Sequence, residues 1–137
     1  MNSLSENSDI KILDIVYSAI VSIEGESIIA RNVEGNEISS GVAGTDDSRV
    51  LTEAINSVPD NGNVLISAGV YNLSADTLFY LDDGETNPFW ICIPILEGKN
   101  VHIFGYGMGI TVLKLKPKQF QVDHPVAMIL NRSSGPV

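Results

Sequence analysis

The chain has 137 residues and a net charge of −9, with 17 acidic residues against eight Lys and Arg. That length suits one domain or a piece of one, and 44% hydrophobic residues are too many for a disordered chain. A chain this acidic repels phosphate backbones, so we expect no nucleic-acid partner.

No apolar run approaches the roughly 18 residues of a membrane-spanning helix, so we expect no membrane insertion. The first residues, MNSLSENSDIKIL, lack the basic-then-apolar pattern of a signal peptide. Cys92 is the one cysteine, which excludes an intrachain disulfide and a four-cysteine zinc site. It lies in the apolar run FWICIPIL, which favours a buried structural thiol.

The N-terminal part of the chain predicts a loose end followed by short antiparallel strands. Residues 1–9 are polar and rich in serine. Residues 10–44 form a β lead-in, because runs of Ile and Val are separated by the turn segments Glu24-Gly25 and Glu34-Gly35-Asn36. The expected strands of this lead-in cover 10–17, 19–23, 27–32 and 37–40.

One helix is predicted, over residues 45–58, with its regular part beginning at about 46. Thr45 or Asp46 is placed to cap the first turn, and the pair Asp46-Asp47 favours the positive end of the helix dipole. Pro59 and the following Asp-Asn-Gly end the helix. Its apolar stripe consists of Val50, Leu51, Ala54, Ile55 and Val58.

Residues 63–137 read as short strands bounded by Gly, Asn, Asp or Pro, with polar loops at 82–88 and 116–125. A faint repeat runs through them, because Val64, Val101 and Val137 are spaced 37 and 36 residues apart. Such a period suggests a solenoid. The expected strands cover 63–67, 70–73, 78–81, 90–96, 100–104, 110–115 and 126–130.

The stretch NVHIFGYGMGITVLKL, residues 100–115, raises the question of a nucleotide-binding loop. A dinucleotide fingerprint needs GxGxxG followed by a helix, whereas Gly105, Gly107 and Gly109 fall as GxGxG before an alternating, β-branched segment. Without a helix there is no row of free amides for phosphate. The glycines therefore predict a sharp corner between two strands, with positive φ angles.

The order of these motifs resembles the opening of pectate-lyase-like right-handed parallel β-helix proteins. The resemblance implies a mainly β fold: the N-terminal coils of a right-handed parallel β-helix, with one capping α-helix (about 46–58) and a small antiparallel lead-in. It implies that 1–137 is a single domain, the N-terminal fragment of a longer β-helix, with its first coils at 63–137. The matching residues are Ala54-Ile55 in the helix, Ile66, Ala68, Gly69 and Tyr71 after it, and Asn100, Val101, Ile103, Gly105, Gly107 and Thr111 around the corner.

No catalytic constellation can be assigned, so we expect no catalytic residue, no cofactor and no dedicated metal site. Helix capping explains Asp46-Asp47, and alternation places His102 on the surface. The segment Asp82-Asp83-Gly84-Glu85 has carboxylates for Ca²⁺, but a solvated acidic turn explains it better because the spacing of a calcium loop is missing.

Each of three further motifs allows two interpretations. Asp123-His124-Pro125 places a carboxylate beside an imidazole, although sequence neighbours rarely face each other productively. Trp90 with Phe89 fits a sugar-stacking platform or, better, packing in the core. Asn72-Leu73-Ser74 and Asn131-Arg132-Ser133 fit the N-glycosylation pattern, which matters only in an exported chain.

We therefore expect a structural or attachment module of an extracellular or virion-surface β-helix protein, with polysaccharide or cell-surface glycan as ligand and no chemistry of its own. The expected partners are further copies, as a trimer, or a partner at the open end after Val137. The alternative is the N-terminal part of a polysaccharide lyase or glycoside hydrolase whose active site lies beyond residue 137. A third alternative is a short protein that covers its open end with a partner.

Overall fold

The computed structural model describes residues 16–80, 88–116 and 126–130. Its first three strands are β1 (Ala19–Glu24), β2 (Ser27–Asn32) and β3 (Glu37–Val42), and they form an antiparallel meander. Gly25 and Gly35 take φ angles of 65° and 87° in the two turns, a conformation that glycine adopts without steric cost. The predicted antiparallel lead-in is confirmed over these strands.

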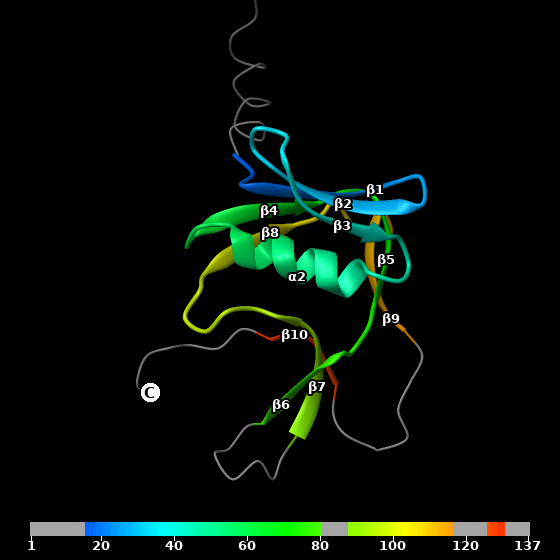
Figure 1. The fold of residues 1–137 in the computed structure, drawn as a ribbon, viewed down its shortest axis with the longest axis vertical. Helices are drawn as coiled ribbons and strands as arrows, with labels where there is room; N and C mark the ends of the chain where they lie inside the picture. Colours follow the sequence, from blue (N-terminus) through cyan, green and yellow to red (C-terminus); the bar gives the residue numbers. More distant parts are fainter. Residues whose placement is uncertain (1–15, 81–87, 117–125, 131–137) are drawn as a thin grey trace, which may run out of the picture.

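The predicted helix is also confirmed, as α2 (Asp47–Ser57). The apolar stripe determines which face of α2 packs against the core: its four residues inside the helix are 0% exposed and Val58 is 3% exposed. α2 packs against β1, β2 and β3 and also against two later strands, β5 (Gly69–Leu73) and β7 (Pro88–Pro94). Figure 1 shows it running below the sheet that contains the meander.

All seven strands predicted after the helix are present, with ends shifted by one or two residues. Unlike the strands of the lead-in, most of these strands pair with segments distant in the sequence. β4 pairs with β8, β5 with β9 and β7 with β10, and each pair is parallel. The strands not yet bounded are β4 (Gly62–Ile66), β6 (Thr77–Tyr80), β8 (Val101–Phe104), β9 (Thr111–Leu115) and β10 (Val126–Leu130).

The predicted right-handed parallel β-helix is wrong. The strands fall into three small sheets: a five-stranded sheet in the order β3-β2-β1-β4-β8, a three-stranded sheet β10-β7-β6 and a two-stranded sheet β5-β9. The first two sheets mix parallel and antiparallel neighbours, and none of the three is solenoid-like. Alternating apolar residues and glycine corners decide which face of a strand is buried but not which strand lies beside it.

The faint repeat corresponds to a real pairing with a different register. Val64 was predicted to be equivalent to Val101, but β4 and β8 align Gly62 with Val101 and Val64 with Ile103. A shift of two residues keeps every side chain on the same face, so the sequence pattern cannot distinguish the two registers. Val137, which would open a third repeat, lies outside the described residues.

The helix does not close the first turn of a solenoid, as the resemblance implied. It fills the space between the sheets, and its buried residues join strands from all three sheets in one core. Burying each large aliphatic side chain contributes about 1.5–3 kcal/mol, so this shared core holds the small sheets together. Among the described residues no helix is long and apolar enough to cross a membrane.

Candidate functional site

The glycine-rich segment between β8 and β9 forms a corner, as predicted. Gly107 and Gly109 have φ angles of 126° and 78°, which glycine tolerates. Gly105 has no positive φ, so the prediction is wrong for this residue. Its absent side chain serves a different purpose, because a Cβ at Gly105 would lie 3.0 Å from the Cβ of Thr111.

Thr111 joins this corner to the segment between β4 and β5. Its Oγ1 accepts the N–H of Tyr106 at 2.8 Å and lies 3.0 Å from the carbonyl oxygen of Ile66, to which it can donate. The N–H of Gly69 donates to the carbonyl of Ile110 at 2.8 Å. The two strand–corner–strand segments therefore lie one on the other along their strands, and Thr111 connects their corners.

The outer segment leaves one side of its strands open. Among the described residues β8 pairs with β4 alone and β9 pairs with β5 alone, so each is the edge strand of its sheet. Edge strands present main-chain N–H and C=O groups that can pair with another chain. We call residues 101–115, which comprise β8, the corner and β9, the open edge.

The inward-facing apolar side chains of the open edge are less covered than their partners on the strands beneath. Val64 and Tyr71 are 0% exposed, whereas their partners Ile103 and Leu113 are half-buried. Leu115 is 41% exposed although its partner, a leucine of β5, is 0% exposed. Between β8 and β9 lies a hollow of about 340 Å³, lined by Ile66, Ile103, Phe104, Gly105, Gly107, Met108, Thr111 and Leu113.

The corner adds exposed apolar side chains to this hollow. Met108 is fully exposed and Tyr106 is 56% exposed. Sequence analysis missed this property of the corner. The available signal was the GYGMG pattern itself, since two large apolar residues alternate there with glycines that cannot shield them.

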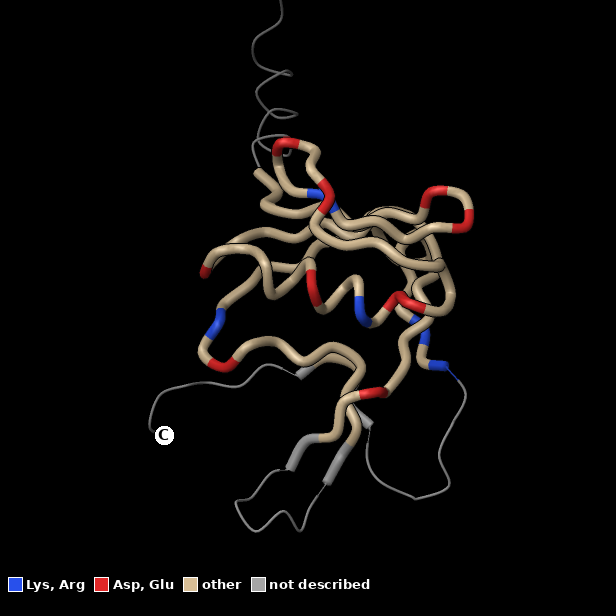
Figure 2. The backbone as a smooth tube through the Cα atoms, in the orientation of Figure 1, with Lys and Arg blue, Asp and Glu red and all other residues tan. Residues whose placement is uncertain are grey.

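The open edge also differs from the rest of the chain in charge. No Asp or Glu occurs between Glu97 and Asp123. Lys114 and Lys116 lie at the end of β9, whereas the hairpin turns of the meander carry acidic residues (Figure 2). The open edge, which contains Lys114 and is followed directly by Lys116, is thus an apolar and basic surface on a chain that is acidic overall.

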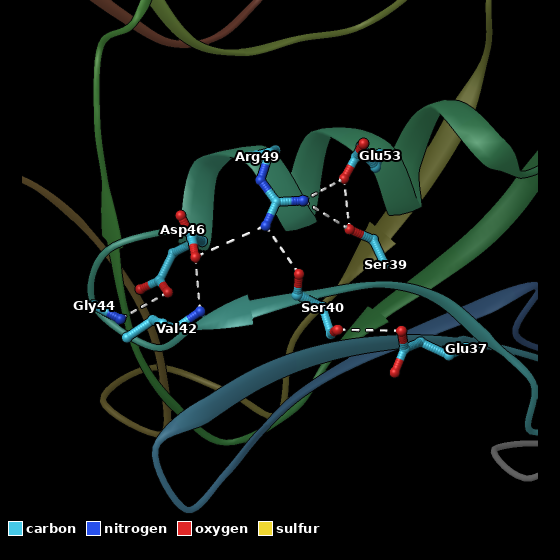
Figure 3. A network of polar contacts seen from close by, with 9 residues as sticks. Glu37, Ser39, Ser40, Val42, Gly44, Asp46, Arg49 and Glu53 are labelled. Atoms are coloured by element: carbon cyan, nitrogen blue, oxygen red, sulfur yellow. Dashed lines mark hydrogen bonds and ion pairs between the residues drawn. The ribbon is translucent and has the colours of Figure 1, made fainter.

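The candidate pair Asp46-Asp47 has a different role from the predicted one. No side chain caps the start of α2. Asp46 Oδ2 accepts the N–H of Val42 at 2.7 Å, and Figure 3 shows this contact beside β3. Asp47 is fully buried and accepts the N–H groups of Gly44 at 2.9 Å and Asn72 at 2.7 Å. The two carboxylates tie α2 to β3 and to β5.

Cys92 is buried, as predicted, at 3% exposure. Burial, with a smaller contribution from Asp76, raises the pKa of its thiol to about 11. A thiol that stays protonated at neutral pH is a poor nucleophile. Cys92 lies at one side of a second hollow, whose other lining residues are Ser48, Arg49, Thr52, Glu53, Asp76, Thr77 and Pro94.

Of the remaining predicted candidates, His102 and Trp90 lie among the residues that the structure describes. His102 is exposed on β8, as predicted, and Trp90 is half-buried on β7. The segments 82–85, 123–125 and 131–133 and the side chain of Phe89 lie outside the described residues. Within the described ranges no three His, Cys, Asp or Glu residues are grouped to hold a metal ion.

Comparison with known proteins gives no match: no protein-family model, no curated protein and no solved structure is similar to the chain at a significant level. The comparisons therefore neither support nor oppose the resemblance to pectate-lyase-like proteins.

Proposed function

We propose that the chain is a structural attachment module that binds a polypeptide partner at the open edge. The observation that carries this proposal is the contrast between inward-facing partners: Val64, Tyr71 and Leu73 are fully buried on β4 and β5. Their partners on β8 and β9 keep partly exposed apolar side chains beside an open main-chain edge. None of the described features of the open edge supports a catalytic role. The extracellular or virion-surface location, the glycan ligand and the trimer stay predictions.

The partner that fits is a segment with two short strands joined by a tight corner. β8 and β9 already lie in this way on β4 and β5, in parallel, so a further segment can extend both sheets in the same direction. Each added main-chain hydrogen bond contributes about 0.5–1.5 kcal/mol net. Covering Ile103, Leu113 and Leu115 adds at most about 1 kcal/mol for each side chain, because Leu115 is 41% exposed and the other two are already partly buried.

Charge favours an acidic partner. Lys114 and Lys116 lie beside the apolar residues of β9, and no acidic residue of the segment 98–122 opposes them. A partner with Asp or Glu flanking its apolar strand would gain rate and specificity from these lysines. We therefore expect binding that weakens as the salt concentration rises.

A labelled synthetic peptide with the sequence of residues 99–116 and the changes Lys114→Glu and Lys116→Glu tests the proposal. It carries the strand–corner–strand pattern that already stacks on β4 and β5, together with the acidic residues that the lysines of the open edge favour. Its binding to the folded chain is followed by fluorescence anisotropy, with a scrambled peptide as control. Ile103→Asp should abolish binding, since it places a charge in the hollow. His102→Asp should bind like the wild type, because this neighbour on β8 faces solvent.

Met108→Asp provides a second variant, since the side chain is fully exposed and its change does not disturb the core. It should weaken binding of the peptide while leaving the melting temperature unchanged. The proposal is refuted if the wild-type chain does not distinguish the peptide from its scrambled control. It is equally refuted if Ile103→Asp, Met108→Asp and His102→Asp, shown to be folded by circular dichroism, all bind the peptide equally well.

A further inference from the structure

We propose that the opposite edge of the five-stranded sheet, β3, is sealed against strand addition by Asp46 and Arg49, so that a second copy of this chain cannot add its β3 to the open edge. The inference rests on the proposed function of the open edge as an attachment surface. It gives the attachment a direction: strands add at β8 and not at β3.

Three main-chain groups on the outer side of β3, at its C-terminal end, are occupied by α2 and the loop before it. Asp46 Oδ2 accepts the N–H of Val42 at 2.7 Å, and Arg49 Nη2 donates to the carbonyl oxygen of Ser40 at 2.9 Å (Figure 3). The carbonyl of Val42 accepts the N–H groups of Thr45 and Asp46 at 3.0 and 2.8 Å. An added strand would need these three groups at the C-terminal end of β3.

The direction of these groups follows from alternation along the strand. The N–H of Ala43 donates to the carbonyl of Glu26, at the start of β2, so odd-numbered residues here turn toward β2. Residues 40 and 42 therefore turn away from β2, toward the edge. Asp46 and Arg49 thus lie where the next strand would lie.

Gly41 makes room for this arrangement. A Cβ at this position would lie 2.5 Å from the Cβ of Asp46 and 2.7 Å from Nη2 of Arg49, distances that real Cβ atoms do not show. Arg49 is in turn held by Glu53, whose Oε1 lies 2.8 Å from its Nη1. Gly41, Asp46 and Arg49 are therefore all needed for the two charged side chains to reach the main chain of β3.

Without the seal, the two edges would be complementary. β3 and β1 are both antiparallel to β2, and β1, β4 and β8 are parallel, so β3 and β8 run in the same direction. The β3 strand of one copy could then extend the sheet of the next copy at β8. Such a head-to-tail contact does not close on itself and leads to open chains of molecules.

The double variant Asp46→Ala/Arg49→Ala tests the seal by sedimentation velocity over a range of protein concentrations. The wild type should form no species that grow with protein concentration. The double variant should form species that grow with concentration, and adding Ile103→Asp should abolish this growth. Glu24→Ala/Arg31→Ala is the matched control, because it removes an ion pair from β1 and β2 without touching the β3 edge.

The proposal is overturned if the folded double variant shows no such growth, or if the control variant assembles to the same extent. Should the double variant fail to fold, the exchange rate of the Val42 amide hydrogen is measured in the single variant Asp46→Ala, which removes the acceptor of this N–H. A sealed edge predicts exchange at least about tenfold faster in the variant, and an unchanged rate refutes the seal. Peptide binding at the open edge is measured separately, so either proposal can fail while the other stands.

Discussion

Replacing Asp47 with alanine should destabilise the fold by about 2–4 kcal/mol, a large share of the 5–15 kcal/mol typical of a domain. Asp47 is the one charged side chain among the largest fully buried side chains of the described residues. Its two carboxylate oxygens accept the N–H groups of Gly44 and Asn72, and so hold the start of α2 against β5.

The magnitude follows from these two contacts. A hydrogen bond to a charged acceptor contributes about 1.5–3 kcal/mol, so the loss of two amounts to about 3–6 kcal/mol. Alanine also removes the cost of burying a carboxylate, which reduces the net loss by one or two kcal/mol, roughly. Asp47→Asn should lose about half as much as alanine, because its carbonyl oxygen can still accept one of the two N–H groups.

Urea unfolding followed by circular dichroism measures the effect, with the slope of the transition checked for constancy. Asp76→Ala serves as the control, since this exposed residue should change stability by less than about 0.5 kcal/mol. A loss below about 0.5 kcal/mol for Asp47→Ala, or equal losses for alanine and asparagine, would show that the buried carboxylate does not hold α2 and β5 together.

Three further predictions concern pH, the thiol and the corner. Burial, with Asp47 as a smaller cause, raises the pKa of Tyr71 to about 12 from 10.0, so the unfolded chain loses this proton first. Stability should fall by about 2–3 kcal/mol as the pH rises from 10 to 12, and Tyr71→Phe should remove this part of the fall in urea midpoints. Cys92 should react with a disulfide reagent at pH 8 much more slowly in the folded chain than in urea, and equal rates would contradict its burial. Thr111→Val should cost about 0.5–1.5 kcal/mol by removing the acceptor of the exposed Tyr106 N–H, while Thr111→Ser, which keeps the hydroxyl, should cost less in the same unfolding assay.

Local structure could be predicted because its signals are local. The apolar stripe of α2 marks one helix face, and alternation marks the strands from β1 to β10, so nearly all elements were found with small errors at their ends. The corner after β8 was predicted for the same reason, since glycines such as Gly107 and Gly109 indicate positive φ angles, which other residues rarely adopt.

The arrangement of the strands could not be predicted in this way. Main-chain hydrogen bonds are alike for every sequence, and a register shift of two residues leaves all side chains on the same face. The sequence pattern around Val64 is therefore equally compatible with a solenoid and with three small mixed sheets. The choice of neighbours was made by packing around α2, which brings β3, β5 and β7 together over one core. The sealed edge depends on the same packing: Asp46 resembles a helix cap in the sequence, and only the approach of α2 to Gly41 turns it toward the main chain of β3.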